Sequence, residues 1–184
     1  LSTNHLRHIA IMDGNNRWAR QRGKSGVTGH KAGVERIRDV MSACQKHGVE
    51  VLTLFAFSSE NWQRPPKEVD ALMGLFLSYL KREAKKLKKE GVKLRVIGNR
   101  SRFSERIQRS IIEAEALASE GATTLAIAAD YGGRWDITQA ARKVAEEVVS
   151  GKRDLDNVDE DAIQSHMSLG DLPAPDLLIR TGGD

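Results

Sequence analysis

The sequence alternates short apolar runs with longer amphipathic stretches, and this alternation limits the possible folds more than any other feature. The apolar runs suit strands buried on both faces of a parallel sheet; they are 8–12, 51–57, 92–97, 124–129 and 177–179. The stretches between them have helical spacing, with apolar residues three and four positions apart within 34–44, 69–80, 107–117 and 137–149. Strands that alternate with helices predict a central, mostly parallel sheet covered by helices. We therefore expect an α/β fold, in one domain spanning 1–184.

Charge and composition narrow the classes of partner. The net charge of +4 and the isoelectric point near 9.3 favour an anionic partner, which could be a diphosphate, a nucleic acid or an acidic membrane surface. An aromatic content of 5% and the absence of a nucleic-acid reader motif predict no nucleic acid. The lysine-rich stretch 81–93 is better explained as the polar face of an exposed helix. The single cysteine, Cys44, excludes an intrachain disulfide and fits a reducing cytosol.

Polar turns rich in glycine, arginine and asparagine follow each predicted strand; they are 13–18, 58–65, 98–100, 130–135 and 180–184. In open parallel sheets the ligand site lies beyond the carboxyl ends of the strands, so these turns should meet at one edge. Glycine lets backbone N–H groups approach an anion, and arginine offers a fork of donors that matches phosphate oxygens. Asp13 among these donors suits Mg²⁺, which binds through one or two carboxylates plus substrate phosphates. The pattern predicts a diphosphate site.

Known phosphate-binding and hydrolase motifs do not account for this pattern. The sequence has no GxxxxGK[ST], no GxGxxG that opens a helix and no GxSxG. It also lacks DDxxD, the metal-binding signature of trans-prenyltransferases.

Five ordered motifs resemble those of the cis-prenyltransferase family, and in particular of the bacterial undecaprenyl diphosphate synthases. They are 8–19, 29–33, 54–65, 131–136 and 176–183, so the likeness covers nearly the whole chain. The resemblance implies a homodimeric α/β enzyme with a hydrophobic tunnel for the growing chain. It also implies a cis condensation of isopentenyl diphosphate with farnesyl diphosphate, with Mg²⁺ as the cofactor. The product would be a long polyprenyl diphosphate such as undecaprenyl diphosphate, the lipid-carrier precursor of cell-wall peptidoglycan. Such an enzyme is cytoplasmic, and its apolar product favours transient contact with a membrane surface.

The resemblance also implies roles for individual residues. Asp13 would hold Mg²⁺ and help the allylic C–O bond to break, and Trp18 would bound the first prenyl unit. The allylic diphosphate would be cradled by Gly14, Asn15, Asn16, Arg17 and His30. Isopentenyl diphosphate would be positioned, and its proton relayed, by Ser58, Ser59, Glu60 and Asn61. Asn61 fills the usual proton-acceptor position, but a neutral amide is a poor base, so the identity of the base stays open. Trp62 and Arg64 would complete the wall, and Arg180 would bind isopentenyl diphosphate.

Three departures from the family pattern bear on this assignment. Asn16 stands where many members have glycine, and asparagine tolerates positive φ better than most residues. Gly26 stands where some members have a phosphate-binding arginine. The sequence stops at Asp184, whereas the family continues with an arginine, a serine and a glutamate that complete the site. If the protein ended there, we would expect it to be poorly active or inactive. The alternative is a non-catalytic, cis-prenyltransferase-like subunit that supports a partner; Asp13, Arg17 and the intact run 58–64 argue against it.

Overall fold

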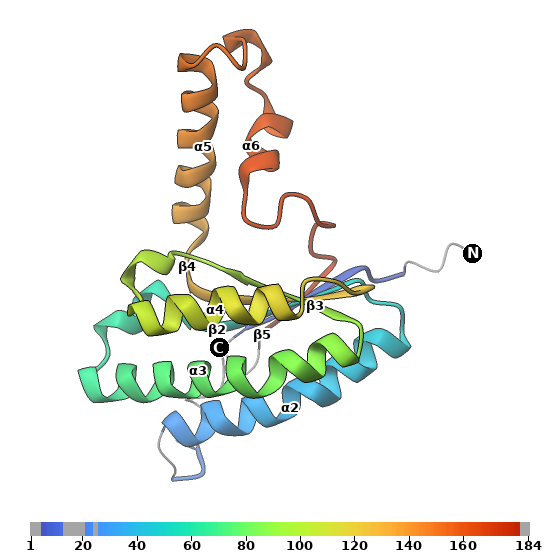
Figure 1. The fold of residues 1–184 in the computed structure, drawn as a ribbon, viewed down its shortest axis with the longest axis vertical. Helices are drawn as coiled ribbons and strands as arrows, with labels where there is room; N and C mark the ends of the chain where they lie inside the picture. Colours follow the sequence, from blue (N-terminus) through green and yellow to red (C-terminus); the bar gives the residue numbers. More distant parts are fainter. Residues whose placement is uncertain (1–4, 13–20, 24–25, 181–184) are drawn as a thin grey trace.

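A computed structural model describes residues 5–12, 21–23 and 26–180 (Figure 1). Its strands are β1 (His8–Met12), β2 (Val51–Ser58), β3 (Val92–Ile97), β4 (Thr123–Tyr131) and β5 (Leu177–Arg180). Its α-helices are α2 (Gly26–Lys46), α3 (Pro66–Lys89), α4 (Glu105–Leu117), α5 (Gly133–Val149) and α6 (Glu160–His166). Short 3₁₀ turns are η1 (Ser59–Gln63), η2 (Arg100–Arg102) and η3 (Leu155–Asn157). None of the helices in these ranges is long and apolar enough to cross a membrane.

The five strands form one sheet in the order β3-β4-β2-β1-β5, and every neighbouring pair is parallel. The predicted α/β class with a parallel sheet is therefore confirmed. Each apolar run identified in the sequence is a strand, because continuous runs of valine, leucine and isoleucine suit a sheet covered on both faces. Since all strands run the same way, their carboxyl ends lie along one edge.

Helices α2, α3 and α4 cover the face of the sheet that carries the large apolar side chains. Leu52, Leu94 and Leu125 are at most 2% exposed and belong to the same cluster as the buried faces of these helices. The predicted apolar face of α3 is confirmed, since Val69, Leu72, Met73, Phe76 and Leu80 are all buried. Burying such a side chain contributes about 1.5–3 kcal/mol, so this layer is the main source of stability.

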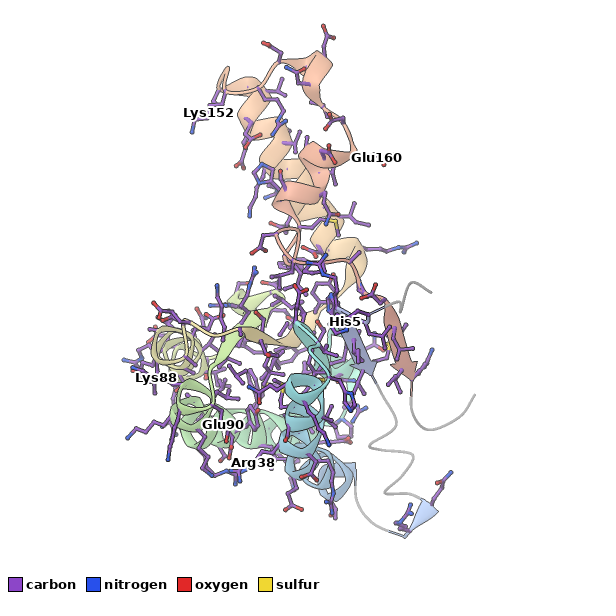
Figure 2. All side chains as sticks on the ribbon, turned by 90° about the vertical axis from the view of Figure 1, so that its right-hand side faces the viewer. His5, Arg38, Lys88, Glu90, Lys152 and Glu160 are labelled. Atoms are coloured by element: carbon purple, nitrogen blue, oxygen red, sulfur yellow. The ribbon has the colours of Figure 1, made fainter. Side chains whose placement is uncertain are left out.

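A buried ion cluster joins α2 to α3 within this layer. The side chain of Glu83 is 4% exposed, and its carboxylate accepts hydrogen bonds of 2.7 and 2.8 Å from Arg38 and of 2.7 Å from the Nε atom of Arg82. Figure 2 shows Arg38 on α2, on the side near α3. Burial alone would raise the pKa of Glu83, but the hydrogen bonds from Arg38 and Arg82 outweigh it and lower the pKa below the ordinary 4.5. The ionised carboxylate therefore fastens the two helices together.

Residues 168–176 pass along the opposite face of the sheet on the way to β5. Arg95 on β3 makes hydrogen bonds of 2.7 and 2.8 Å with the carboxylate of Asp171, and His8 on β1 bonds the carbonyl of Pro173. The carboxylate of Asp176 accepts the backbone N–H groups of Arg7 and His8 at 2.7 and 2.9 Å. These contacts fix where β5 begins.

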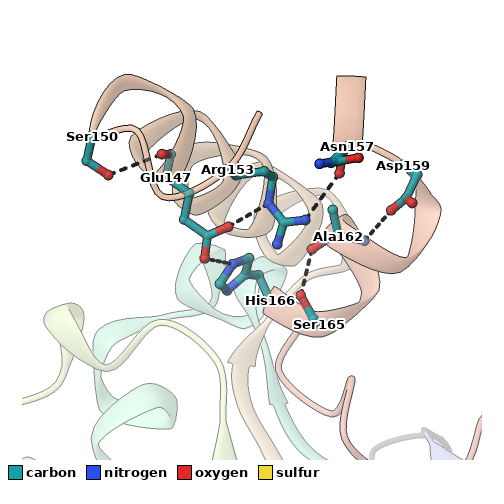
Figure 3. A network of polar contacts seen from close by, with 8 residues as sticks. All are labelled: Glu147, Ser150, Arg153, Asn157, Asp159, Ala162, Ser165 and His166. Carbon is teal, nitrogen blue, oxygen red and sulfur yellow. Dashed lines mark hydrogen bonds and ion pairs between the residues drawn. The ribbon is translucent and has the colours of Figure 1, made fainter. Parts of the chain in front are cut away.

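Helices α5 and α6 form an arm that extends from the sheet on the side away from α2 and α3 (Figure 1). The far part of the arm is tied by Glu147, whose carboxylate pairs at 2.7 Å with both Arg153 and His166 (Figure 3). A side chain of Asp159 caps α6 through the N–H of Ala162. The acidic stretch 154–161 thus contains η3 and the first residues of the short helix α6.

One sequence prediction about burial is wrong. Residues 177–179 form a strand as predicted, but they are not buried on both faces, since Leu177, Leu178 and Ile179 are 38%, 58% and 37% exposed. The physical reason is position: β5 lies at the edge of the sheet and pairs only with β1 among the described strands. The single cysteine, Cys44, is buried on α2 and is 4% exposed.

Candidate functional site

The ends of the described strands meet at the carboxyl edge of the sheet, where the predicted site segments begin. β1 ends at Met12, β2 at Ser58, β3 at Ile97, β4 at Tyr131 and β5 at Arg180. The strand order places the turn after β2 between those after β4 and β1. This confirms the predicted meeting of the strand ends. The parts of the prediction that fall on Asp13, Gly14, Asn15, Asn16, Arg17, Trp18 and 181–184 lie outside the described residues.

At this edge Arg180 lies beside the end of β1, although the two are far apart in the sequence. In the β1–β5 pairing, Met12 and Arg180 are opposite each other. The residue after Met12 is Asp13. The structure therefore brings the predicted isopentenyl diphosphate ligand Arg180 next to the point where the predicted metal and allylic diphosphate segment begins.

The turn after β2 carries the second group of predicted site residues. Ser58 ends the strand, and η1 (Ser59–Gln63) contains the predicted residues Ser59, Glu60, Asn61 and Trp62. Pro65 and Pro66 follow shortly after it. Proline is well suited to the first turn of a helix, so the pair ends the turn and starts α3. The side chains of Ser58, Ser59 and Glu60 lie outside the described part of the structure, as does that of His30 on α2.

Arg64 is held against the start of α3. Its guanidinium pairs with the carboxylate of Glu68 at 2.7 Å, and both side chains are about a quarter exposed, at 25% and 29%. The ion pair holds the guanidinium close to the first turn of α3. The role of Arg64 as a wall residue of the site remains a prediction.

Trp62 is packed among aromatic rings. Its ring meets Phe57 edge-on with centroids 5.0 Å apart and lies 6.1 Å from Phe103. Arg102 on η2 lies over the ring, with Cζ 4.6 Å from the centroid. The indole Nε1 is buried and has no hydrogen-bond partner among the described residues. Trp62 is therefore a packing anchor between β2 and the turn after β3.

The turn after β3 approaches the end of β4 very closely. A Cβ atom at Gly98, where φ is +120°, would overlap the carbonyl oxygen of Ala129. The N–H of Asn99 donates to the carbonyl of Asp130 at 3.0 Å. Only glycine allows this approach, so Gly98 has a structural reason for its place in the predicted turn.

The turn after β4 is fixed by Asp136, which is 3% exposed. Its carboxylate accepts the hydroxyl of Tyr131 at 2.9 Å, and the backbone N–H and hydroxyl of Ser168 at 3.0 and 2.8 Å. Burial and the bond to Asp136 raise the pKa of Tyr131, so the phenol stays neutral and remains a donor. Asp136 thus ties the start of the arm to the segment that leads into β5.

Arg102 and Phe103 are site-edge residues that the sequence reasoning missed. Neither lies in a recognised motif, and a buried aromatic beside an exposed arginine gives no period or spacing that could mark them. The described residues also contain no group of three or more histidine, cysteine or acidic side chains that could hold a metal ion. The predicted ligand Asp13 lies outside that set.

The fold and this edge define a class: a parallel α/β protein whose glycine- and arginine-bearing turns face one edge of the sheet. Residues 11–184 match a family model described as "Putative undecaprenyl diphosphate synthase". The chain therefore belongs to the undecaprenyl diphosphate synthase family of cis-prenyltransferases.

Curated relatives support the same family. One is a ditrans,polycis-undecaprenyl-diphosphate synthase, (2E,6E)-farnesyl-diphosphate specific, from Pseudomonas putida, which is 56% identical over 97% of this chain and 72% of the relative. An enzyme of the same description from Aliivibrio fischeri is 53% identical over 97% of this chain and 70% of the relative.

Solved structures share the fold. Lavandulyl diphosphate synthase from Lavandula x intermedia, in complex with dimethylallyl diphosphate, is 35% identical with a TM-score of 0.92. The match covers 98% of this chain and 79% of that one. A probable undecaprenyl diphosphate synthase from Campylobacter jejuni is 30% identical with a TM-score of 0.78, covering 99% of this chain and 78% of that one.

Proposed function

We propose that this protein condenses isopentenyl diphosphate with farnesyl diphosphate in cis and makes a long polyprenyl diphosphate such as undecaprenyl diphosphate. The observation that carries the proposal is the register of β1 with β5, which brings Arg180 beside the entry to the Asp13–Trp18 segment. The relatives at 53–56% identity that act on farnesyl diphosphate support the choice of allylic substrate. We further propose that the chain works as one catalytic domain.

The proposed chemistry uses two sets of residues, one for each substrate. The allylic diphosphate would be bound by Gly14, Asn15, Asn16, Arg17 and His30. When the C–O bond breaks, negative charge grows on the leaving diphosphate, and arginine and backbone N–H donors stabilise it. The terminal alkene carbon of isopentenyl diphosphate then forms the new C–C bond, and a proton leaves the resulting cation. Ser58, Ser59, Glu60 and Asn61 would hold isopentenyl diphosphate, with Arg180, and relay that proton.

Mg²⁺ is the proposed cofactor. A carboxylate that meets substrate phosphates at the edge of a parallel sheet is a donor set that this hard cation prefers, and Asp13 supplies one. Bound there, the ion would neutralise charge on the leaving diphosphate. Trp18, Trp62 and Arg64 would shield the reacting carbon from water.

The growing apolar product needs space inside the protein and a route of release. We propose a hydrophobic tunnel between the sheet and the helices α2 and α3, since that layer holds the large apolar side chains. We also propose a homodimer in the cytoplasm that touches the membrane surface transiently to deliver its apolar product.

Labelled isopentenyl diphosphate, supplied with farnesyl diphosphate and Mg²⁺, tests the proposal. The natural full-length chain should transfer label into long, lipid-extractable product, and chelation of Mg²⁺ should stop it. Asp13→Ala should lower kcat/KM by at least about a hundredfold, as expected when charge stabilisation of a leaving group is lost. Asp70→Ala, which changes an exposed aspartate on α3, is the matched control and should retain wild-type activity. No product from the wild-type chain would instead favour a non-catalytic subunit.

A further inference from the structure

One guanidinium connects three of the turns at the carboxyl edge. Arg102 on η2 lies over the ring of Trp62 on η1, with 4.6 Å between Cζ and the ring centroid. Its Nη1 atom is 3.9 Å from Oδ1 of Asp130, near the end of β4. The turns after β2, β3 and β4 thus share a contact that we call the Asp130–Arg102–Trp62 bridge.

The backbone of Asp130 is in a strained conformation. Its φ of +52° makes it the one described non-glycine residue in the left-handed region. In the β2–β4 pairing Phe57 is opposite Ala129 and Ser58 is opposite Tyr131, so Asp130 is an extra, bulged residue. Such strain destabilises the folded backbone and collects at functional sites, where a bulge re-aims a side chain.

The bridge also contains buried polar atoms, which destabilise the folded protein further. The Asp130 side chain is 2% exposed, and its Oδ2 has no hydrogen-bond partner among the described residues. The Nε1 of Trp62 is buried and unpartnered in the same way. A buried polar atom without a partner destabilises the folded state, because it has lost its hydrogen bonds to water. Plain packing would not retain a strained, buried carboxylate, so the charge of Asp130 needs a separate explanation.

We propose that Asp130 and Arg102 are positioning residues for isopentenyl diphosphate. The buried carboxylate attracts the guanidinium, which is otherwise 48% exposed, and keeps it over Trp62. Phe57 contacts the same ring edge-on at 5.0 Å, so the indole is held from two directions. Trp62 belongs to η1, which also contains Ser59, Glu60 and Asn61. Holding the ring therefore holds the turn that would bind isopentenyl diphosphate.

This inference rests on the proposed function and predicts an unequal effect on the two substrates. The bridge acts on the turn after β2, whereas the allylic diphosphate would be bound mainly by the turn after β1. Loss of the bridge should therefore raise KM for isopentenyl diphosphate and leave KM for farnesyl diphosphate nearly unchanged. A general loss of folding would affect both substrates together.

Steady-state kinetics on the natural full-length chain test the bridge. Arg102→Ala should raise KM for isopentenyl diphosphate about tenfold, comparable with loss of a cation–π contact in a partly desolvated site. Its KM for farnesyl diphosphate should stay within about twofold. Arg102→Lys keeps a cation over the ring and should recover most of the loss. Arg106→Ala, an exposed arginine on α4, is the control and should match wild type.

The variant Asp130→Asn tests the charge of the Asp130 side chain without changing its size. Asparagine fills the same space and tolerates positive φ, but it is neutral. We expect it to behave like Arg102→Ala, and the double variant should be no worse than Arg102→Ala alone, because both changes break one bridge. Equal KM changes for the two substrates, an additive double variant, or an Arg102→Ala protein that matches Arg106→Ala would overturn the inference.

Acrylamide quenching of Trp62 fluorescence tests, without an activity assay, whether Arg102 and Asp130 shield the ring of Trp62. Its signal is obtained as the difference between each protein and its Trp62→Phe counterpart. Arg102→Ala and Asp130→Asn should increase quenching of Trp62 relative to wild type and Arg106→Ala, because one face of the ring opens to solvent. Unchanged quenching would refute the bridge. If the wild-type chain forms no product, the proposed function fails while this result still stands.

Discussion

Glu83 offers the sharpest test of how the helical layer is fastened. Replacement by glutamine keeps the size of the side chain but removes the charge that accepts bonds from Arg38 and Arg82. Hydrogen bonds to a charged group contribute about 1.5–3 kcal/mol each. The two arginines are 52% and 59% exposed, so water replaces much of what they lose. We therefore expect Glu83→Gln to lower the free energy of unfolding by about 2 kcal/mol in total.

Chemical and thermal unfolding measure this change. A loss of about 2 kcal/mol corresponds to a fall in Tm of about 4–8 °C for a domain of this size. The matched control is Arg36→Ala, which breaks an ion pair with Asp39 whose side chains are 78% and 68% exposed. That exposed pair on α2 should leave the midpoint unchanged within error.

The pH dependence of the stability difference between wild type and Glu83→Gln tests the same ion cluster. The pKa of Glu83 is lower in the folded protein than its ordinary 4.5, so its stabilisation is complete above pH 4.5. It is lost as the pH falls through the folded-state pKa, where the carboxylate takes up a proton. The difference between wild type and Glu83→Gln should therefore be constant near neutrality and shrink in acid. A difference that is absent at pH 7, or that grows in acid, would refute the reasoning.

Four further substitutions test other parts of the fold by thermal unfolding. Leu80→Ala should cost about 2–5 kcal/mol, because Leu80 is 1% exposed and its removal leaves a cavity; a loss under 1 kcal/mol would contradict the packing. Gly98→Ala should lower Tm because its Cβ would overlap the carbonyl of Ala129, whereas Gly74→Ala, with open space around it on α3, should raise Tm slightly. Asp176→Asn should lower stability near neutral pH, since backbone N–H groups of His8 and Arg7 lower the pKa of this carboxylate below 3.8; the difference from wild type should vanish in stronger acid.

The strands and helices were largely predictable because their apolar periods differ. The runs 8–12 and 92–97 coincide with β1 and β3, and the apolar face of α3 is buried as expected. Strand order was not predictable, since the period of a run carries no information about its neighbours. The exposure of Leu178 on β5 shows the same limit: an apolar run looks alike at the edge and in the middle of a sheet.

The site was predictable as a set of turns but not as a set of contacts. Parallel strands bring their carboxyl ends to one edge, so Arg180 and the turn after β2 could be assigned to a common site from sequence. The bulge at Asp130 depends on register shifts between β2 and β4, and Arg102 reaches Trp62 only through the fold. The roles of Asp13 and His30 remain predictions, and the Asp13→Ala kinetics test the first of them.

The configuration of the product tests the central claim most directly. Product made from farnesyl diphosphate and isopentenyl diphosphate by the natural full-length chain can be dephosphorylated and its double bonds assigned by NMR. We predict two trans bonds in the internal units carried over from farnesyl diphosphate and a cis bond in every unit added. A product whose added units are trans, or the absence of any elongated product, would contradict the assignment to cis-prenyl transfer.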